Sequence, residues 1–124
     1  MADSQAAPHI QIYHNPGCSK SRQCMALLQQ LGDPIETIYY LEHPPQRNEL
    51  EELLLKLGMR PSALIRQGEA IYQELSLAGR SEDDLLQAML DHPILIERPV
   101  VVVGQRAIIG RPPESVRDWL SRVS

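Results

Sequence analysis

Residues 10–22 read IQIYHNPGCSKSR, an apolar run followed by a loop and then by polar residues that open a helix. Ile10–Tyr13 is predicted to be a buried strand because it is short and apolar. The loop of residues 15–17 then brings Cys18 to the start of the helix. Backbone N–H groups at a helix start have no intrahelical partner, so they stabilise a thiolate and also bind an oxyanion. The stretch therefore predicts a reactive thiol placed where a phosphate-like anion can bind.

The helix after Cys18 has an apolar face on which Cys24, Leu27, Leu28 and Leu31 are spaced i, i+3, i+4 and i+7. Gly32 ends this helix, and the Asp33-Pro34 pair prevents its continuation. Cys24 is therefore predicted to be a core residue. Six helical steps separate the two cysteines by about 9 Å, beyond the roughly 7 Å limit for disulfide geometry. We expect no bridge between them.

The rest of the chain is predicted from apolar periodicity and from proline and glycine punctuation. The expected elements are a strand at 35–41, a helix opened by Pro44-Pro45 and stopped by Gly58, a short helix from Pro61 that carries Arg66 near its end, a helix from Ser81 to His92, strands at 100–103 and 106–109 joined by a two-residue hairpin, and a helix opened by Pro112-Pro113.

This order is β-α-β, several helices, then β-β-α. It predicts an α/β fold with a thioredoxin-like core, in which the first two strands are parallel. The helices of residues 45–92 form an insertion between the second and third strands. With 124 residues in all, we expect residues 10–124 to form a single domain preceded by a disordered lead-in, residues 1–9.

Composition excludes several classes of protein. A net charge of −4 argues against a general nucleic-acid binder, which is basic. No apolar run approaches the length of a membrane span, and the first nine residues lack the pattern of a signal peptide. Two cysteines make no secreted disulfide framework. The cytoplasm is the expected compartment, and a monomer is the simplest assembly.

Cys18 is the predicted nucleophile, and its pKa should be lowered by the helix start. His14 either simply ends the strand or, as an imidazolium, helps Cys18 to ionise. Ser21 is either an ordinary first-turn residue or a hydrogen-bond donor to the thiolate. A dithiol motif would have its second cysteine at position 21, where this chain has Ser21. The pattern is therefore Cys-x-x-Ser, and any redox cycle needs an external thiol.

Three arginines are candidates for oxyanion binding, because guanidinium groups bind tetrahedral oxyanions through paired hydrogen bonds. Arg98 precedes Pro99 and a predicted strand, and Arg111 follows the next strand. Both should lie at sheet ends near the Cys18 loop. Arg66 lies in the helical insertion, and each arginine alone would be interpreted as a solvated charge. The four histidines show no zinc-ligand spacing, so no metal site is predicted.

Taken together, these motifs resemble the glutaredoxin-linked, ArsC-like arsenate reductase family over residues 10–123. The matching pieces, which fall in order with similar spacing, are IYHNPxC at 12–18 with Ser21-Arg22, YLExPP at 40–45, LIR at 64–66, HPILIxRPVVV at 92–102 and RP at 111–112. The chain is shorter at its C-terminus than the longer arsenate reductases and looks closer to a compact chromosomal branch.

The resemblance implies a role for each matching residue. Cys18 corresponds to the nucleophile, and His14 and Ser21 to residues that assist its ionisation. The oxyanion-binding arginines correspond to Arg66, Arg98 and Arg111, and Pro99 to the cis-proline of thioredoxin-like folds. The implied activity is reduction of arsenate to arsenite, with glutathione as co-substrate, glutaredoxin as protein partner and no tightly bound cofactor.

Two alternatives remain open at this point. Some regulators of this fold bind RNA polymerase and sense oxidation, but those commonly carry Cys-x-x-Cys where this chain has Ser21 at the second position. A glutathione-dependent thiol-transfer enzyme would use the same cysteine and would need no arginine triad.

Overall fold

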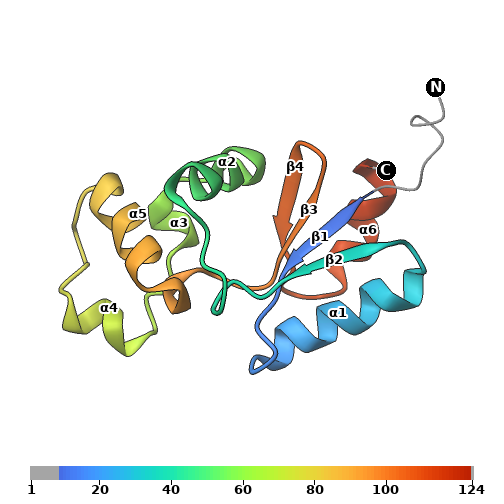
Figure 1. Cartoon of the computed structure of the whole chain (residues 1–124), viewed down its shortest axis with the longest axis horizontal. Coiled ribbons are helices and arrows are strands. Elements are labelled where there is room, and N and C mark those ends of the chain that lie inside the picture. The colour runs from blue at the N-terminus through green and yellow to red at the C-terminus, as the bar shows by residue number, and fades with distance from the viewer. Residues whose placement is uncertain (1–8, 124) are drawn as a thin grey trace. The chain divides into compact units, whose positions relative to one another are not determined.

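The computed structural model describes residues 9–123 (Figure 1). All but the last residue of the expected lead-in, 1–9, therefore lies outside the described part. The chain divides into two compact units, of which the first combines residues up to Ile38 with those from Arg98 onward and the second is Tyr39–Glu97. The insertion expected at residues 45–92 falls inside the second unit.

The first unit contains a four-stranded sheet with the order β2-β1-β3-β4 (Figure 1). Its strands are β1 (Ile10–Tyr13), β2 (Ile35–Ile38), β3 (Val100–Val103) and β4 (Arg106–Ile109). β1 pairs in parallel with β2 and antiparallel with β3, and β3 pairs antiparallel with β4. The predicted β-α-β and β-β-α core, including the hairpin after β3, is confirmed.

Two helices pack against this sheet, α1 (Ser19–Leu31) and α6 (Ser115–Val123). Gly32 ends α1 in the left-handed conformation, with φ 83°, as its position predicted. The predicted core role of Cys24 is confirmed, because its side chain is fully buried. The core of this unit joins side chains of β1, β3 and both helices: Ile10, Ile12, Cys24, Leu28, Val101, Val116, Trp119 and Leu120.

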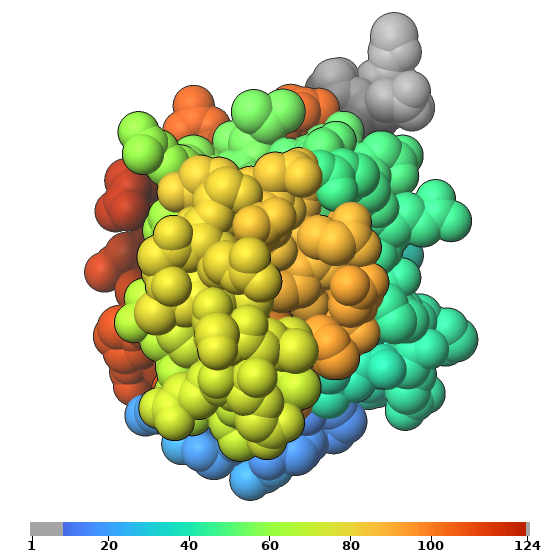
Figure 2. All heavy atoms as spheres, turned by 90° about the vertical axis from the view of Figure 1, so that its left-hand side faces the viewer, coloured from blue at the N-terminus to red at the C-terminus, as the bar shows by residue number. Residues whose placement is uncertain are grey.

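The second unit is helical. Its elements are α2 (Arg47–Leu57), α3 (Pro61–Leu64), α4 (Ala70–Glu74), α5 (Glu82–Asp91) and the short 3-10 helix η2 (Pro93–Leu95). Figure 2 shows the face of this unit that carries α4 in yellow-green and α5 in yellow to orange. Leucines on one face of α2 and of α5 are buried, as their spacing predicted. Within residues 9–123, every helix is too short or too polar to cross a membrane.

Several predicted boundaries move because local hydrogen bonds compete with the regular elements. The strand expected to reach residue 41 ends at Ile38, since Tyr39 accepts turn hydrogen bonds from the N–H groups of Glu42 and His43. The helix expected at Pro44-Pro45 begins at Arg47, after Gln46, whose N–H donates to the Glu49 carboxylate at 2.8 Å.

Local hydrogen bonds also accompany the shifted bounds of α3 and of the last helix. α3 ends at Leu64, so Arg66 lies just after it, where its N–H donates to the Leu95 carbonyl at 2.7 Å. The last helix begins at Ser115, after a turn in which Ser115 N–H donates to the carbonyl of Pro112. The short helices α4 and η2 were not predicted. The helix expected from Ser81 to His92 is confirmed as α5, and Ser81 caps it because its hydroxyl accepts the Asp84 N–H at 3.1 Å.

We expect Gly110→Ala to lower the free energy of unfolding by about 1–3 kcal/mol, because it overpacks the core of the first unit. The added methyl carbon would lie 2.9 Å from Cys24 Sγ and 3.1 Å from Pro99 Cγ. Chemical denaturation measures the loss. Gly68→Ala is the matched control, since a methyl group there meets open space. Equal stabilities of the two variants would contradict the prediction.

Candidate active site

Cys18 occupies the position immediately before α1 and has an extended backbone, with φ −106° and ψ 125°. Its carbonyl accepts the first helical hydrogen bond, from the Arg22 N–H at 3.0 Å. Its own N–H donates to the Asn15 carbonyl at 3.0 Å, which closes the loop after β1. The side chain is partly exposed. The sulfur therefore lies at the start of a 13-residue helix, as the sequence predicted.

The surroundings of Cys18 favour its thiolate. Burial acts to raise the pKa of the thiol, but this effect is outweighed by hydrogen bonds from the Ser21 N–H, the Arg98 side chain and the Lys20 N–H. The charge of Arg98 adds to them, and the net result is a pKa below the ordinary value for cysteine. The donors in the first turn of α1 thus cooperate with the guanidinium of Arg98, which lies two residues before β3.

Ser21 is fully buried, and its hydroxyl turns toward the loop. Ser21 Oγ accepts the N–H of Asn15 at 3.0 Å and lies 2.6 Å from His14 Nδ1. In the tautomer that carries its proton on Nε2, His14 accepts the hydroxyl hydrogen of Ser21. Ser21 therefore reaches the sulfur through its backbone N–H, while its hydroxyl joins the loop to α1. This differs from the hydroxyl–thiolate hydrogen bond considered from the sequence.

His14 is buried beside Ser21 at the end of β1. Burial, together with the charge of Arg22, lowers the pKa of His14 below its ordinary value. The neutral imidazole is therefore the main form near neutral pH. The imidazolium expected to help Cys18 to ionise is disfavoured for this reason. His14 instead forms a hydrogen bond with the hydroxyl of Ser21, and Ser21 in turn donates its backbone N–H to the sulfur.

The first unit also brings Arg98 and Arg111 together. Arg98 hydrogen-bonds the Cys18 sulfur, and Arg111 Nη1 donates to the Arg98 carbonyl at 3.4 Å. The peptide bond between Arg98 and Pro99 is cis, as expected. The bond between Arg111 and Pro112 is also cis, which the sequence did not predict. Both arginines therefore lie at sheet ends, as predicted, and Arg98 contacts the nucleophile directly.

Arg66 belongs to the second unit, where it forms two ion pairs. Arg66 Nη1 lies 2.6 Å from a Glu97 oxygen, and Arg66 Nε lies 3.1 Å from a Glu69 oxygen. All three side chains are partly buried, which strengthens such pairs compared with exposed ones. The role of Arg66 in oxyanion binding stays a prediction.

Sequence reasoning did not assign a role to Asn15, which the structure places at the centre of the loop. Its side-chain Oδ1 accepts the Gly17 N–H at 2.9 Å. Arg22 Nη1 also donates to the carbonyl of Pro16 at 2.7 Å. The signal for this turn was the sequence Asn15-Pro16-Gly17, because an asparagine side chain commonly binds the N–H two residues on.

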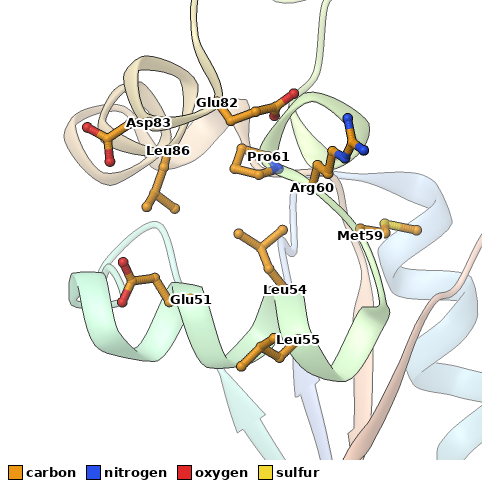
Figure 3. Close-up of a pocket in the computed structure, with 9 residues that line it drawn as sticks. All are labelled: Glu51, Leu54, Leu55, Met59, Arg60, Pro61, Glu82, Asp83 and Leu86. Carbon is orange, nitrogen blue, oxygen red and sulfur yellow. The ribbon is translucent and has the colours of Figure 1, made fainter.

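A separate groove of about 440 Å³ lies among α2, α3 and α5 of the second unit (Figure 3). Leu54 and Leu86 face each other across it. The polar lining consists of three carboxylates and one guanidinium: Glu51, Glu82, Asp83 and Arg60. A groove with more negative than positive groups, and with no thiol in its lining, does not suit an oxyanion-dependent thiol reaction.

The family follows from comparison with known proteins. Residues 13–119 match the model of the ArsC family, and this stretch includes the loop and helix around Cys18 as well as both cis-prolines. The chain belongs to the ArsC family. This membership confirms the resemblance noted from the sequence.

Individual members of the ArsC family are similar over nearly their whole lengths. The uncharacterized protein YfgD of Escherichia coli K12 is 50% identical over 112 residues, or 88% of this chain and 94% of that protein. An arsenate reductase of Neisseria meningitidis serogroup A is 41% identical over 116 residues, covering 91% and 99%. A solved arsenate reductase structure from Vibrio cholerae has a TM-score of 0.86 at 46% identity, covering 90% and 98%.

Arg98→Ala should make Cys18 less acidic, because it removes both a hydrogen bond and a positive charge from the sulfur. The thiolate fraction near neutral pH should fall severalfold, as followed by the ultraviolet absorbance of the thiolate during a pH titration. Arg106→Ala, at an exposed position on β4 of the same unit, is the control. An unchanged titration in Arg98→Ala would contradict the assignment.

His14 should make the free energy of unfolding depend on pH. Because its folded pKa lies below its unfolded value, the unfolded chain binds more protons between the two, and stability falls as pH drops through this window. Between about pH 7.5 and about pH 5, the wild type should therefore lose more stability than His14→Gln. Denaturation at both pH values measures this. The exposed-site variant His43→Gln should behave as the wild type, and an equal loss in His14→Gln would refute the account.

Proposed function

We propose that this ArsC-family chain reduces arsenate to arsenite, with glutathione and glutaredoxin as electron donors. The observation that carries the proposal is the Cys18 sulfur held by first-turn N–H groups of α1 and by the Arg98 guanidinium. Such a site favours a nucleophilic thiolate and, at the same place, an oxyanion. Relatives at 41% identity that are named arsenate reductases support the choice of substrate.

Arsenate is a tetrahedral oxyanion that carries negative charge near neutral pH. In this proposal its oxygens bind two guanidinium groups: that of Arg98, which hydrogen-bonds the Cys18 sulfur, and that of Arg111, whose Nη1 donates to the Arg98 carbonyl. Arg66 is the third proposed ligand, and binding would replace its present carboxylate partners with arsenate oxygens. Positive charge around the anion offsets the repulsion between the substrate and the attacking thiolate.

The proposed reaction begins when the Cys18 thiolate attacks arsenic(V) and a hydroxyl group, taking up a proton, leaves as water. Glutathione then displaces a second hydroxyl as water, so that arsenic carries both sulfurs. A glutaredoxin thiolate attacks the glutathione sulfur, and the electron pair of that arsenic–sulfur bond stays on arsenic, which becomes arsenic(III). The mixed disulfide of glutaredoxin and glutathione leaves. Water then releases arsenite and regenerates the Cys18 thiolate.

External thiols are required in this scheme because the chain offers no second reactive cysteine near Cys18. Ser21 occupies the second position of the dithiol spacing, and Cys24 is fully buried in the core. Burial raises the pKa of Cys24 to about 12, so it stays a thiol under ordinary conditions. No tightly bound cofactor enters the scheme, and we place the reaction in the cytoplasm, where glutathione keeps thiols reduced.

A coupled assay tests the proposal. Purified protein, arsenate, glutathione, glutaredoxin and glutathione reductase are combined, and NADPH consumption is followed. We expect turnover that stops when arsenate, glutathione or glutaredoxin is omitted and that is lost in Cys18→Ser. Cys24→Ser is the matched control, because a buried cysteine outside the reaction should leave the rate per folded molecule nearly unchanged.

Other outcomes of the same assay would identify the alternatives. Arsenate-independent reduction of a glutathione mixed disulfide, retained in Arg98→Ala, would replace the proposal with a thiol-transfer enzyme. A chain without either activity that co-purifies with RNA polymerase would be a regulator. Parent-rate arsenate reduction by Cys18→Ser would eliminate the thiolate mechanism.

A further inference from the structure

Asn15 makes three hydrogen bonds inside the Cys18 loop, although it is no part of the predicted chemistry. Its carbonyl accepts the Cys18 N–H at 3.0 Å, and its Oδ1 accepts the Gly17 N–H at 2.9 Å. Its own N–H donates to Ser21 Oγ at 3.0 Å, which ties the loop to the first turn of α1. Asn15 is only 8% exposed, and its bond to Ser21 is buried whereas its bond to Gly17 is partly buried.

These bonds determine which backbone donors remain for the sulfur. The N–H groups of Gly17 and Cys18 are both used within the turn by acceptors of Asn15. The donors that face the sulfur come instead from the helix, at Lys20 and Ser21. A loop without this turn would leave its own N–H groups unsatisfied, and it would no longer fix the sulfur over the helix start.

We propose that Asn15 is a positioning residue of this site, whose hydrogen bonds hold the Cys18 sulfur against the N–H groups of α1. The Asn15 side chain does not touch the sulfur in this account and acts through Gly17 and the shape of the turn. The inference deepens the proposed function, since it concerns the same thiolate, but it does not depend on which electrophile the thiolate attacks.

The test is the pH dependence of Cys18 alkylation by iodoacetamide in Asn15→Ala. Mass spectrometry of the Cys18 peptide separates this reaction from that of the buried Cys24. We expect the rate profile to shift to higher pH, with alkylation near neutral pH slower by about threefold or more, as befits the loss of one hydrogen bond. Asn15→Ser should restore part of the rate, because a serine hydroxyl forms the same turn more weakly.

The control is Asn48→Ala, which removes an exposed asparagine from α2 of the second unit and should leave the profile unchanged. An Asn15→Ala protein with native circular dichroism, a lower melting temperature and an unshifted profile would overturn the proposal, since it would show a merely structural role. If Asn15→Ala does not fold, an unshifted profile in Asn15→Gly, which also lacks the side-chain acceptor for the Gly17 N–H, has the same meaning. The assay contains no arsenate, so its outcome is independent of the arsenate reductase test.

Discussion

The candidate active site depends on one electrostatic arrangement, in which the start of α1 directs its N–H groups at the sulfur of Cys18. A partly buried thiol by itself would be less acidic than a free one, because a low-dielectric setting disfavours the charged form. Helical donors and Arg98 reverse that outcome. The same donors attract an anion, so a single helix end suits both a thiolate and a bound oxyanion.

The core of the first unit keeps this helix end in place. α1 is anchored in its first turn by Ser21 and further along by Cys24 and Leu28, all fully buried. The close approach of Gly110 to Cys24 shows how little free space remains beside the helix. The two cysteines therefore lie in different environments. Cys18 is partly exposed at the helix start, whereas Cys24 fills the core as a small apolar side chain.

The sequence was sufficient for the order of the strands and longer helices and for the position of Cys18, because both rest on local signals: apolar periodicity, glycine stops and proline starts. It was less reliable where local turn hydrogen bonds compete with strand pairing, as at Tyr39, whose carbonyl accepts two backbone N–H groups and ends the strand early. The neutral state of His14 was not predictable, since it results from burial in the folded chain. The sequence also could not show that Arg98 contacts the sulfur, because that contact joins residues 80 positions apart.

The burial of Cys24 has a further consequence for how this chain withstands oxidants. A peroxide that reaches Cys18 would convert its thiolate to a sulfenic acid, and the only other sulfhydryl of the chain is shut inside the core. An intramolecular disulfide cannot rescue that state. Protection against irreversible sulfinic acid formation must come from small thiols in solution, which form a mixed disulfide with Cys18. How long Cys18 stays reducible therefore depends on the concentration of such thiols around the protein.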